Sequence, residues 1–154
     1  MPAVEFVSHS AEETIAMGRD LARRLTAPVL VLLSGDLGSG KTTLTKGIIS
    51  GLGAAREEDV TSPTFTLMHV FHNHVAGSAR ARYPHAKVYH VDLYRIEKLH
   101  DLETVGLEDA FADPAIVIIE WSERFALRND WPQVVVRLEH IEGETRRITI
   151  ATDL

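Results

Sequence analysis

One glycine-rich segment restricts this chain to a small set of folds. Residues 35–42 read Gly-Asp-Leu-Gly-Ser-Gly-Lys-Thr and match the pattern G-x-x-x-x-G-K-[ST] at each fixed position. The segment follows the apolar run Val29–Leu33 and opens Lys41–Leu52, which is typical of a helix. A strand, a glycine turn and a helix in this order direct backbone N–H groups toward a phosphate. The segment therefore predicts a phosphate-binding loop, and the alternative is an ordinary tight turn beside a solvated lysine.

The residue types in this loop suit a nucleotide bound with a metal ion. Glycines at 35, 38 and 40 permit backbone angles and close approach that a Cβ would prevent. Lys41 supplies a mobile positive charge for β- and γ-phosphates, and Thr42 supplies a hydroxyl for Mg²⁺. The loop therefore predicts nucleotide binding.

Two acidic residues follow apolar runs and are candidates to complete the site. Glu120 ends the run Ile116–Ile119, and Asp92 ends Val88–Val91. A carboxylate at such a strand end can hold the metal ion or its water. The alternatives are a solvent-facing acid for Glu120 and a helix or turn cap for Asp92.

A hydroxyl-rich segment, Thr61-Ser62-Pro63-Thr64, lies between the predicted helix and the next predicted strand. Its proline fixes the local backbone, and its hydroxyl groups are suited to sensing a γ-phosphate. The alternative interpretation is an ordinary polar loop with a Ser-Pro turn.

The rest of the chain predicts strands that alternate with helices. Val4–Val7 alternates like a strand, and Ser10 with Glu13 forms a capping box that predicts a helix start. Val29–Leu33 and Ala115–Ile119 lack polar alternation, which is typical of strands covered on both faces. The other expected elements are strands over Phe65–Phe71, Lys87–Tyr94, Val134–Ile141 and Arg146–Ala151 and a helix over Asp101–Phe111.

This pattern predicts an α/β fold like that of P-loop NTPases. We expect a three-layer sandwich with a mixed central sheet, antiparallel hairpins and flanking helices. Residues 1–154 are expected to form a single domain, with residues 72–86 as an extended hairpin loop.

Composition and charge exclude several function classes. Lys and Arg number 16 against 22 Asp and Glu, and the net charge of −6 disfavours nucleic-acid binding as the main activity. The absence of cysteine excludes disulfides, thiolate metal sites and cysteine nucleophiles. The longest apolar runs are too short to span a bilayer, and the first ten residues do not resemble a signal peptide. We therefore expect a cytoplasmic protein that binds neither membrane nor DNA.

Five segments of the chain together resemble the bacterial TsaE family, small ATPases of the pathway that forms threonylcarbamoyladenosine on tRNA. The loop alone indicates only a nucleotide, whereas the sequences HVDLYR and IEW at these distances are specific to the family. The resemblance extends from about Glu12 to Arg147. In chain order, the segments are Gly35–Thr43, Ser62–Phe65, His90–Arg95, Leu107–Asp109 and Ile119–Arg124.

The resemblance implies roles for individual residues. Mg²⁺ would be held by Thr42 and Glu120, and Asp92 would orient or deprotonate the attacking water. The base and sugar would lie near Glu123 and the Ser10–Glu13 stretch. ATP would be bound by Gly38, Ser39, Gly40, Lys41, Thr42 and Thr43, and the switch would consist of Thr61, Ser62, Pro63 and Thr64.

The resemblance also implies a place in a larger assembly. In this family, the ATPase acts on a complex of two partner proteins, and that complex modifies tRNA next to the anticodon. Hydrolysis resets the complex between rounds. The residues predict in-line attack of water on the γ-phosphate, with Lys41 and Asp92 as the catalytic side chains. No arginine is obviously placed as a finger, so we expect a Mg²⁺-dependent ATPase that is weak alone, is stimulated by its partners and meets tRNA only indirectly.

Two regions depart from the family pattern. Residues 72–86 are longer than expected and carry Arg80 and Arg82, which together with Lys87 suit contact with an acidic partner surface or the tRNA backbone. His72-x-His74 predicts a metal site only weakly, because nothing supplies a third ligand at helical spacing. Glu144 and its neighbours match the family loosely.

Other functions remain open from the residues alone. A small-metabolite kinase with a P-loop is the main alternative, and residues 72–86 are the only segment that could serve as its lid. A GTP-dependent switch is opposed by the absence of an Asn-Lys-x-Asp motif. A protein that binds ATP without hydrolysing it would leave Asp92 and Glu120 without a role.

Overall fold

Strands and helices alternate along the chain, as expected for an α/β protein. The structure is a computed structural model that describes residues 2–64, 66–72, 86–98, 101, 106–125, 129–152 and 154. The strands are β1 (Ala3–Ser8), β2 (Val29–Ser34), β3 (Met68–His72), β4 (Lys87–Asp92), β5 (Ile116–Glu120), β6 (Gln133–Glu142) and β7 (Thr145–Thr152). The helices are α1 (Ala11–Ala22), α2 (Lys41–Gly51) and α4 (Leu107–Ala110), with short 3₁₀ helices η1 (Glu57–Asp59) and η4 (Ser122–Arg124).

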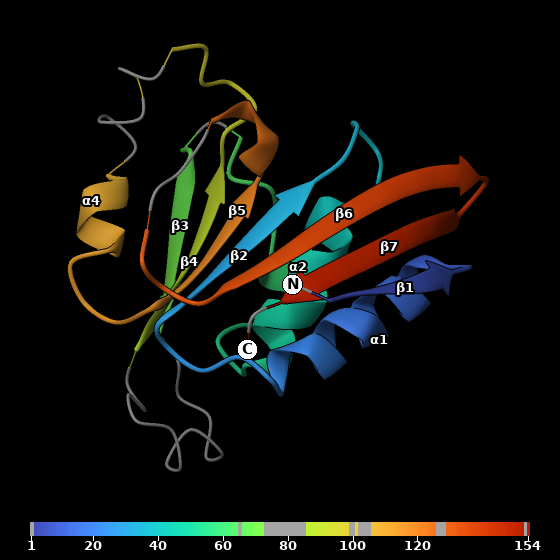
Figure 1. Ribbon diagram of the computed structural model, residues 1–154, viewed down its shortest axis with the longest axis horizontal. Helices are drawn as coiled ribbons and strands as arrows, with labels where there is room; N and C mark the ends of the chain where they lie inside the picture. The colour runs from blue at the N-terminus through green and yellow to red at the C-terminus, as the bar shows by residue number, and fades with distance from the viewer. Residues whose placement is uncertain are drawn as a thin grey trace.

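Seven strands of the described residues form one sheet in the order β1-β7-β6-β2-β5-β4-β3 (Figure 1). β2 pairs in parallel with β5 and β6, and β4 pairs in parallel with β5. β3 pairs antiparallel with β4, while β7 pairs antiparallel with both β6 and β1. This arrangement confirms the predicted mixed sheet. Because parallel strands share one direction, β2, β4 and β5 end at the same edge of the sheet.

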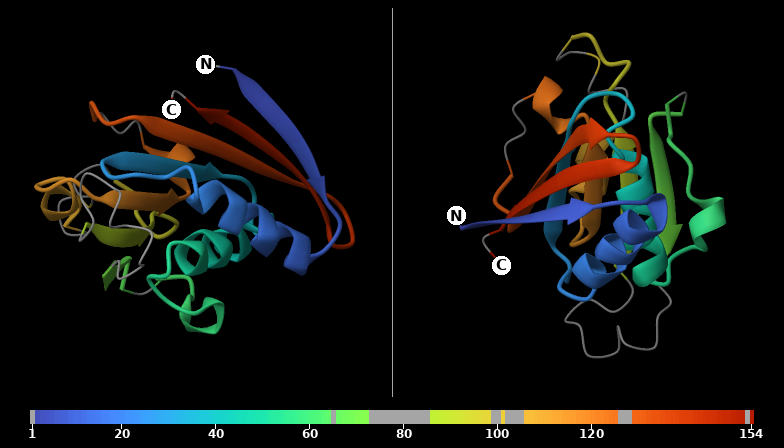
Figure 2. Two further views of the ribbon diagram at one scale, coloured as in Figure 1. Left: turned by 90° about the horizontal axis from the view of Figure 1, so that it is seen from below. Right: turned by 90° about the vertical axis from the view of Figure 1, so that its right-hand side faces the viewer.

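Both faces of the central strands are covered, as their uninterrupted apolar runs predict. Val29, Val31 and Leu33 of β2 lie in a core with residues of α1 and α2. Leu30 lies in a second core on the other face, which includes Leu107 of α4. Figure 2 shows α1 and α2 together on one face of the sheet. The fold is therefore the three-layer α/β arrangement that the sequence predicts.

Helices α1 and α2 pack with their backbones close together. A Cβ built on Gly47 of α2 would lie 2.1 Å from the carbonyl oxygen of Ile15 and 3.0 Å from Cα of Gly18, both in α1. Only a residue without a side chain fits at this crossing. The contact fixes the helix that begins at the predicted phosphate loop against the helix that begins at Ser10.

Three predicted boundaries are wrong, each for a local reason. The strand predicted from Phe65 begins at Met68, because Leu67 has φ 68° and leaves the β region. The strand predicted to end at Tyr94 ends at Asp92, because the Asp92 carboxylate accepts from the backbone N–H of Tyr94 and caps a turn there. The helix predicted over Asp101–Phe111 does not run continuously, since Gly106 has φ 86° and α4 begins after it.

Some predictions fall partly or wholly outside the described residues. The long hairpin loop is described only at its ends, His72 and Ala86, and Arg80, Arg82 and His74 lie outside. Its two flanking strands do pair antiparallel, as a hairpin requires. None of the helices in the described ranges is long and apolar enough to cross a membrane.

Candidate nucleotide-binding site

The predicted phosphate loop joins β2 to α2 at the carboxyl edge of the sheet. Gly35 has φ 147°, and a Cβ on it would lie 2.4 Å from the carbonyl oxygen of Leu138. Gly40 caps α2 in the left-handed conformation with φ 104°, and α2 begins at Lys41. The N-terminus of a helix offers unpaired backbone N–H groups to an anion. The loop therefore has the geometry that the motif predicts.

Lys41 lies within its own loop and is only 5% exposed. Its Nζ donates to the carbonyl oxygens of Gly35 at 2.6 Å and Asp36 at 3.0 Å. The ammonium also lies 3.9 Å from the centre of the Trp121 ring. Burial lowers the pKa of Lys41, and the neighbouring carboxylates, Glu120 first among them, act in the opposite direction. The loop thus holds a desolvated cation.

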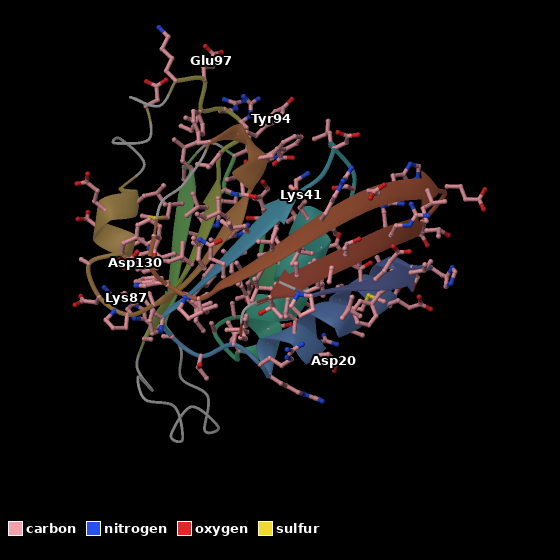
Figure 3. All side chains as sticks on the ribbon, in the orientation of Figure 1. Asp20, Lys41, Lys87, Tyr94, Glu97 and Asp130 are labelled. Carbon is pink, nitrogen blue, oxygen red and sulfur yellow. The ribbon has the colours of Figure 1, made fainter. Side chains whose placement is uncertain are left out.

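Figure 3 places Lys41 within the structure as a whole. Lys41 and Tyr94 lie at the end of the sheet where β2 and β4 finish. Lys87, the first residue of β4, lies at the opposite end. The candidate site and the ends of the long hairpin loop are therefore separated by the length of β4.

Glu120 points into the site and not toward solvent. It ends β5, is 2% exposed and accepts a hydrogen bond from Thr42 Oγ1 at its Oε1, with a distance of 2.8 Å. Its other oxygen, Oε2, contacts Nε2 of the fully buried His90. The solvent-facing alternative for Glu120 is therefore wrong.

Asp92 lies beside Glu120 on the neighbouring strand and is 3% exposed. Its Oδ2 accepts hydrogen bonds from Ser62 Oγ at 2.6 Å and from Thr64 Oγ1 at 3.4 Å. Its Oδ1 accepts from the backbone N–H of Tyr94 at 2.8 Å. One oxygen thus caps the turn after β4, as the alternative interpretation held, while the other connects Asp92 to the hydroxyl-rich segment.

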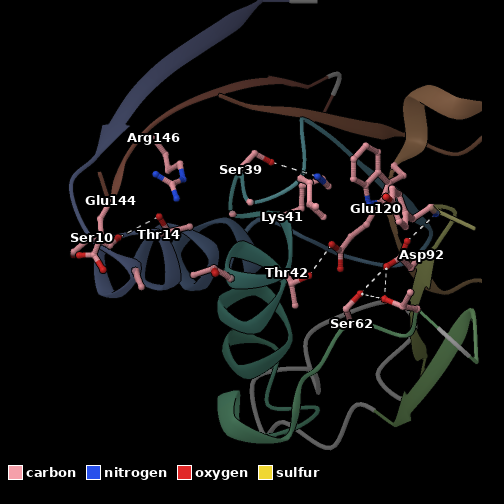
Figure 4. Close-up of a pocket in the computed structure, with 18 residues that line it drawn as sticks. Ser10, Thr14, Ser39, Lys41, Thr42, Ser62, Asp92, Glu120, Glu144 and Arg146 are labelled. Carbon is pink, nitrogen blue, oxygen red and sulfur yellow. Dashed lines mark hydrogen bonds between the residues drawn. The ribbon is translucent and has the colours of Figure 1, made fainter. Parts of the chain in front are cut away.

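These side chains line one cavity of about 460 Å³ (Figure 4). Thr42, Glu120, Asp92 and Ser62 gather at one end of it, while Ser10 and Thr14 lie at the other. The lining residues are Ser10, Ala11, Thr14, Leu37, Gly38, Ser39, Gly40, Lys41, Thr42, Thr43, Ser62, Thr64, Asp92, Tyr94, Glu120, Trp121, Glu144 and Arg146.

Three predicted residues lie beside this cavity without lining it. Glu123 accepts a hydrogen bond from the backbone N–H of Gly35 at 3.0 Å, at the start of the loop. Pro63 is buried and Thr61 is exposed, whereas Ser62 and Thr64 on either side of the proline reach the cavity.

The cavity also contains residues that sequence reasoning did not assign to it. Arg146 and Glu144, from β7 and the turn before it, lie at the same end as Ser10 and Thr14 (Figure 4). Tyr94 stacks on Trp121 with ring centres 4.8 Å apart. Both aromatics belong to the HVDLYR and IEW segments, so those segments were a signal. No motif pointed to Arg146, more than a hundred residues after the loop.

The oxygen atoms at this end of the cavity fit Mg²⁺. Mg²⁺ prefers oxygen ligands and is commonly held by one or two carboxylates together with substrate phosphates. Thr42 Oγ1 and Glu120 Oε1 are two such atoms, 2.8 Å apart at the start of α2. Among the described residues, no group of three or more His, Asp or Glu side chains is placed to hold a metal ion. The weak His72-x-His74 prediction extends outside the described residues.

Comparison with known proteins identifies the relatives of this chain. Residues 8–148 match the family model for threonylcarbamoyl adenosine biosynthesis protein TsaE. The tRNA threonylcarbamoyladenosine biosynthesis protein TsaE of Treponema pallidum is 34% identical over 145 residues, which is 94% of this chain and 98% of that protein. The protein of the same name from Mycobacterium tuberculosis H37Rv is 34% identical over 143 residues, which is 89% of this chain and 79% of that protein.

A solved structure shows the same fold. The crystal structure of Bacillus subtilis YdiB superimposes with a TM-score of 0.69 and 26% sequence identity, over 98% of this chain and 86% of that one. The family model covers nearly the whole chain, including the loop, β4 and β5. The chain therefore belongs to the TsaE family, whose members are named for the biosynthesis of threonylcarbamoyladenosine in tRNA.

Proposed function

We propose that this chain is a Mg²⁺-dependent ATPase that resets the partner complex of threonylcarbamoyladenosine synthesis between rounds. The observation that carries the proposal is the hydrogen bond between Thr42 of the phosphate loop and Glu120 of β5, with Asp92 on the next strand. A loop hydroxyl, a strand-end carboxylate and a second acid at one cavity end suit phosphoryl transfer to water.

Lys41 and the loop backbone are the proposed phosphate-binding groups. Lys41 already lies in the loop with its charge directed at the carbonyl oxygens of Gly35 and Asp36. A phosphate would offer this desolvated ammonium a full negative charge, which is a stronger partner than a carbonyl oxygen. Gly38, Ser39, Gly40 and Thr43 line the cavity beside it and would supply N–H groups at the start of α2.

Thr42 and Glu120 are the proposed metal-holding residues. When bound, Mg²⁺ would neutralise charge on the phosphate oxygens during transfer. Thr42 would contribute its hydroxyl oxygen, and Glu120 would contribute the carboxylate oxygen that now accepts from Thr42.

Asp92 is the proposed residue that orients the attacking water. Its Oδ2 accepts hydrogen bonds from Ser62 and Thr64. An attacking water would donate a hydrogen bond to the same oxygen. We infer that Thr61–Thr64 form a switch: a γ-phosphate would compete for the Ser62 and Thr64 hydroxyls and leave Oδ2 for water. The rate would then come from positioning and charge stabilisation.

The second cavity end is proposed to hold the base and sugar. Ser10, Thr14, Glu144 and Arg146 line it, and all carry polar groups. Arg146 Nη1 donates to the carbonyl oxygens of Gly143 and Thr145, which fixes the arginine on the β6–β7 turn. Glu123 instead supports the start of the loop through Gly35. Among the described residues that line the cavity, the arginine lies at this end and not beside Thr42 and Asp92, and we therefore expect weak activity in the absence of partners.

The kinase alternative receives no support from the positions of the described residues. The lid candidate from the sequence is the segment 72–86, and the described residues beside it, His72 and Lys87, lie at the opposite end of β3 and β4 from Asp92. A lid acts by closing over the reacting phosphate. We therefore retain ATP hydrolysis as the proposed reaction.

The proposal is tested by reconstituting tRNA modification with the two partner proteins and an excess of tRNA over their complex. Wild-type protein should support many rounds per complex, whereas Lys41→Ala should support no more than about one round, because the loop loses its phosphate-binding charge. Arg23→Ala, which removes an exposed cation outside the cavity, is the control and should behave as wild type. Repeated rounds with Lys41→Ala at the wild-type rate would contradict the proposal.

A further inference from the structure

His90 is a fully buried polar side chain that the proposed reaction does not yet use. It lies in β4, two residues before Asp92, and its exposed fraction is 0%. Its Nε2 contacts Glu120 Oε2 across the β4–β5 pair. A histidine in an apolar strand interior requires a partner, and Glu120 is that partner.

The two ring nitrogens of His90 have different surroundings. Nδ1 has no hydrogen-bond partner among the described residues, whereas Nε2 faces a carboxylate oxygen. A hydrogen on Nδ1 would be a buried donor without an acceptor, which is rarer in proteins than an unused lone pair. The hydrogen therefore belongs on Nε2, and His90 donates to Glu120.

The ring of His90 is held in place by its neighbours. His69 is its direct partner across the β3–β4 pair and packs edge-on against it, with ring centres 6.3 Å apart. The ring itself is fully shielded from solvent. A ring confined in this way presents its Nε2–H in a fixed direction.

The donated hydrogen bond determines which oxygen of Glu120 faces the phosphate loop. Oε2 is taken by His90, and Oε1 accepts from Thr42 at 2.8 Å. Rotation of the carboxylate would break both contacts at once. Groups that hydrogen-bond to a metal-binding carboxylate commonly orient it and raise metal affinity.

We propose that His90 is a positioning residue that holds the Glu120 carboxylate with Oε1 directed at Thr42, so that these two oxygens are preorganised for Mg²⁺. The inference rests on the proposed function, which assigns Mg²⁺ to Thr42 and Glu120. It adds a residue that touches neither nucleotide nor metal ion.

The test is Mg²⁺-dependent binding of a fluorescent methylanthraniloyl derivative of ADP, with no turnover involved. Two variants lack the donor, His90→Phe and His90→Leu, and a matched control, His90→Gln, keeps an N–H group near the Nε2 position. All are titrated with the nucleotide in EDTA and then with Mg²⁺ at a fixed nucleotide concentration.

We expect the donor-free variants to bind the nucleotide in EDTA as wild type does. Their half-saturating Mg²⁺ concentration should rise about 10- to 100-fold, because the carboxylate is no longer oriented. His90→Gln should stay close to wild type. At least one donor-free variant must keep its EDTA affinity for this pattern to appear, and that affinity also reports that the variant is folded.

Two results would overturn the proposal. An unchanged Mg²⁺ requirement in a donor-free variant would show that His90 does not position Glu120, and loss of EDTA binding in both donor-free variants would show a role in packing only. Wild-type protein that gains no affinity from Mg²⁺ would refute the proposed function itself, and the inference with it.

Discussion

At the scale of single residues, the present contacts of Lys41 differ from those that its proposed role requires. Its charge is satisfied by backbone carbonyl oxygens and by the face of Trp121, a residue held in the left-handed conformation with φ 61°. These contacts keep the side chain inside the loop. Burial still lowers its pKa, so the fold leaves the ammonium less well solvated than water would.

This desolvation predicts a pH dependence of stability that Lys41→Met removes. Because the folded state lowers the pKa of Lys41 below its ordinary value of 10.5, the unfolded chain binds more protons between the two values. The unfolding free energy of the wild-type protein should therefore rise with pH in that window, relative to Lys41→Met. Urea unfolding of both proteins without nucleotide, from about pH 7 to about pH 10, measures this difference. Equal pH dependence in the two proteins would contradict it.

The site residues that could be predicted from the sequence lie at recognisable positions, either within the phosphate-loop motif or at the end of an apolar strand. Glu120 and Asp92 were predictable because a polar residue that ends an apolar strand meets the carboxyl edge of a parallel sheet. The His90–Glu120 contact was not, since nothing in the sequence shows which face of a buried strand a histidine occupies. Arg146 was not predictable either, because the register of β7 determines where it lies.

At the scale of elements, the close packing of α1 against α2 connects the two ends of the cavity. α2 begins at the phosphate loop, and α1 begins directly after Ser10 and carries Thr14 in its first turn. The crossing at Gly47 fixes the spacing between these helix starts. In the proposed binding mode, this packing would set the distance over which the nucleotide extends.

Gly47→Ala should destabilise the protein although alanine favours helices. A Cβ at this position would lie 2.1 Å from the Ile15 carbonyl oxygen, and no side-chain rotation relieves a clash with backbone. We expect the net unfolding free energy to fall by about 1–3 kcal/mol, against a helix-propensity gain of about 1 kcal/mol. The midpoint temperature of thermal unfolding and the nucleotide affinity should both fall.

Ala16→Gly is the matched control for this helix pair. Ala16 is exposed on α1, so the change costs only helix propensity, about 1 kcal/mol, and should leave nucleotide affinity unchanged. A Gly47→Ala protein that is as stable as wild type would show that the helices can separate without cost.

Element types followed from sequence periodicity, while some element ends did not. β2 and α2 were recognisable because an apolar run, a glycine turn and a helical pattern follow one another without interruption. The ends near Leu67 and Gly106 depend on left-handed backbone conformations. Such conformations are set by tertiary packing and leave little trace in hydrophobic periodicity.

At the scale of the whole molecule, the sheet topology gathers residues that are far apart in the chain. The parallel strands β2, β5 and β4 bring the loop, Glu120 and Asp92 to one edge, and the β6–β7 hairpin adds Arg146. A net charge of −6 is compatible with a protein that takes part in tRNA modification while its partners bind the RNA. The proposed work of this molecule is therefore done on proteins.

The central claim, ATP hydrolysis at this edge and its use by partner proteins, is tested most directly by phosphate release from ATP. We predict slow release by the wild-type protein alone, clear stimulation by the two partner proteins, and a fall of about 100- to 1,000-fold in the stimulated rate for Lys41→Ala and for Asp92→Asn. Wild-type rates in both variants, or a rate that the partners leave unchanged, would contradict the account.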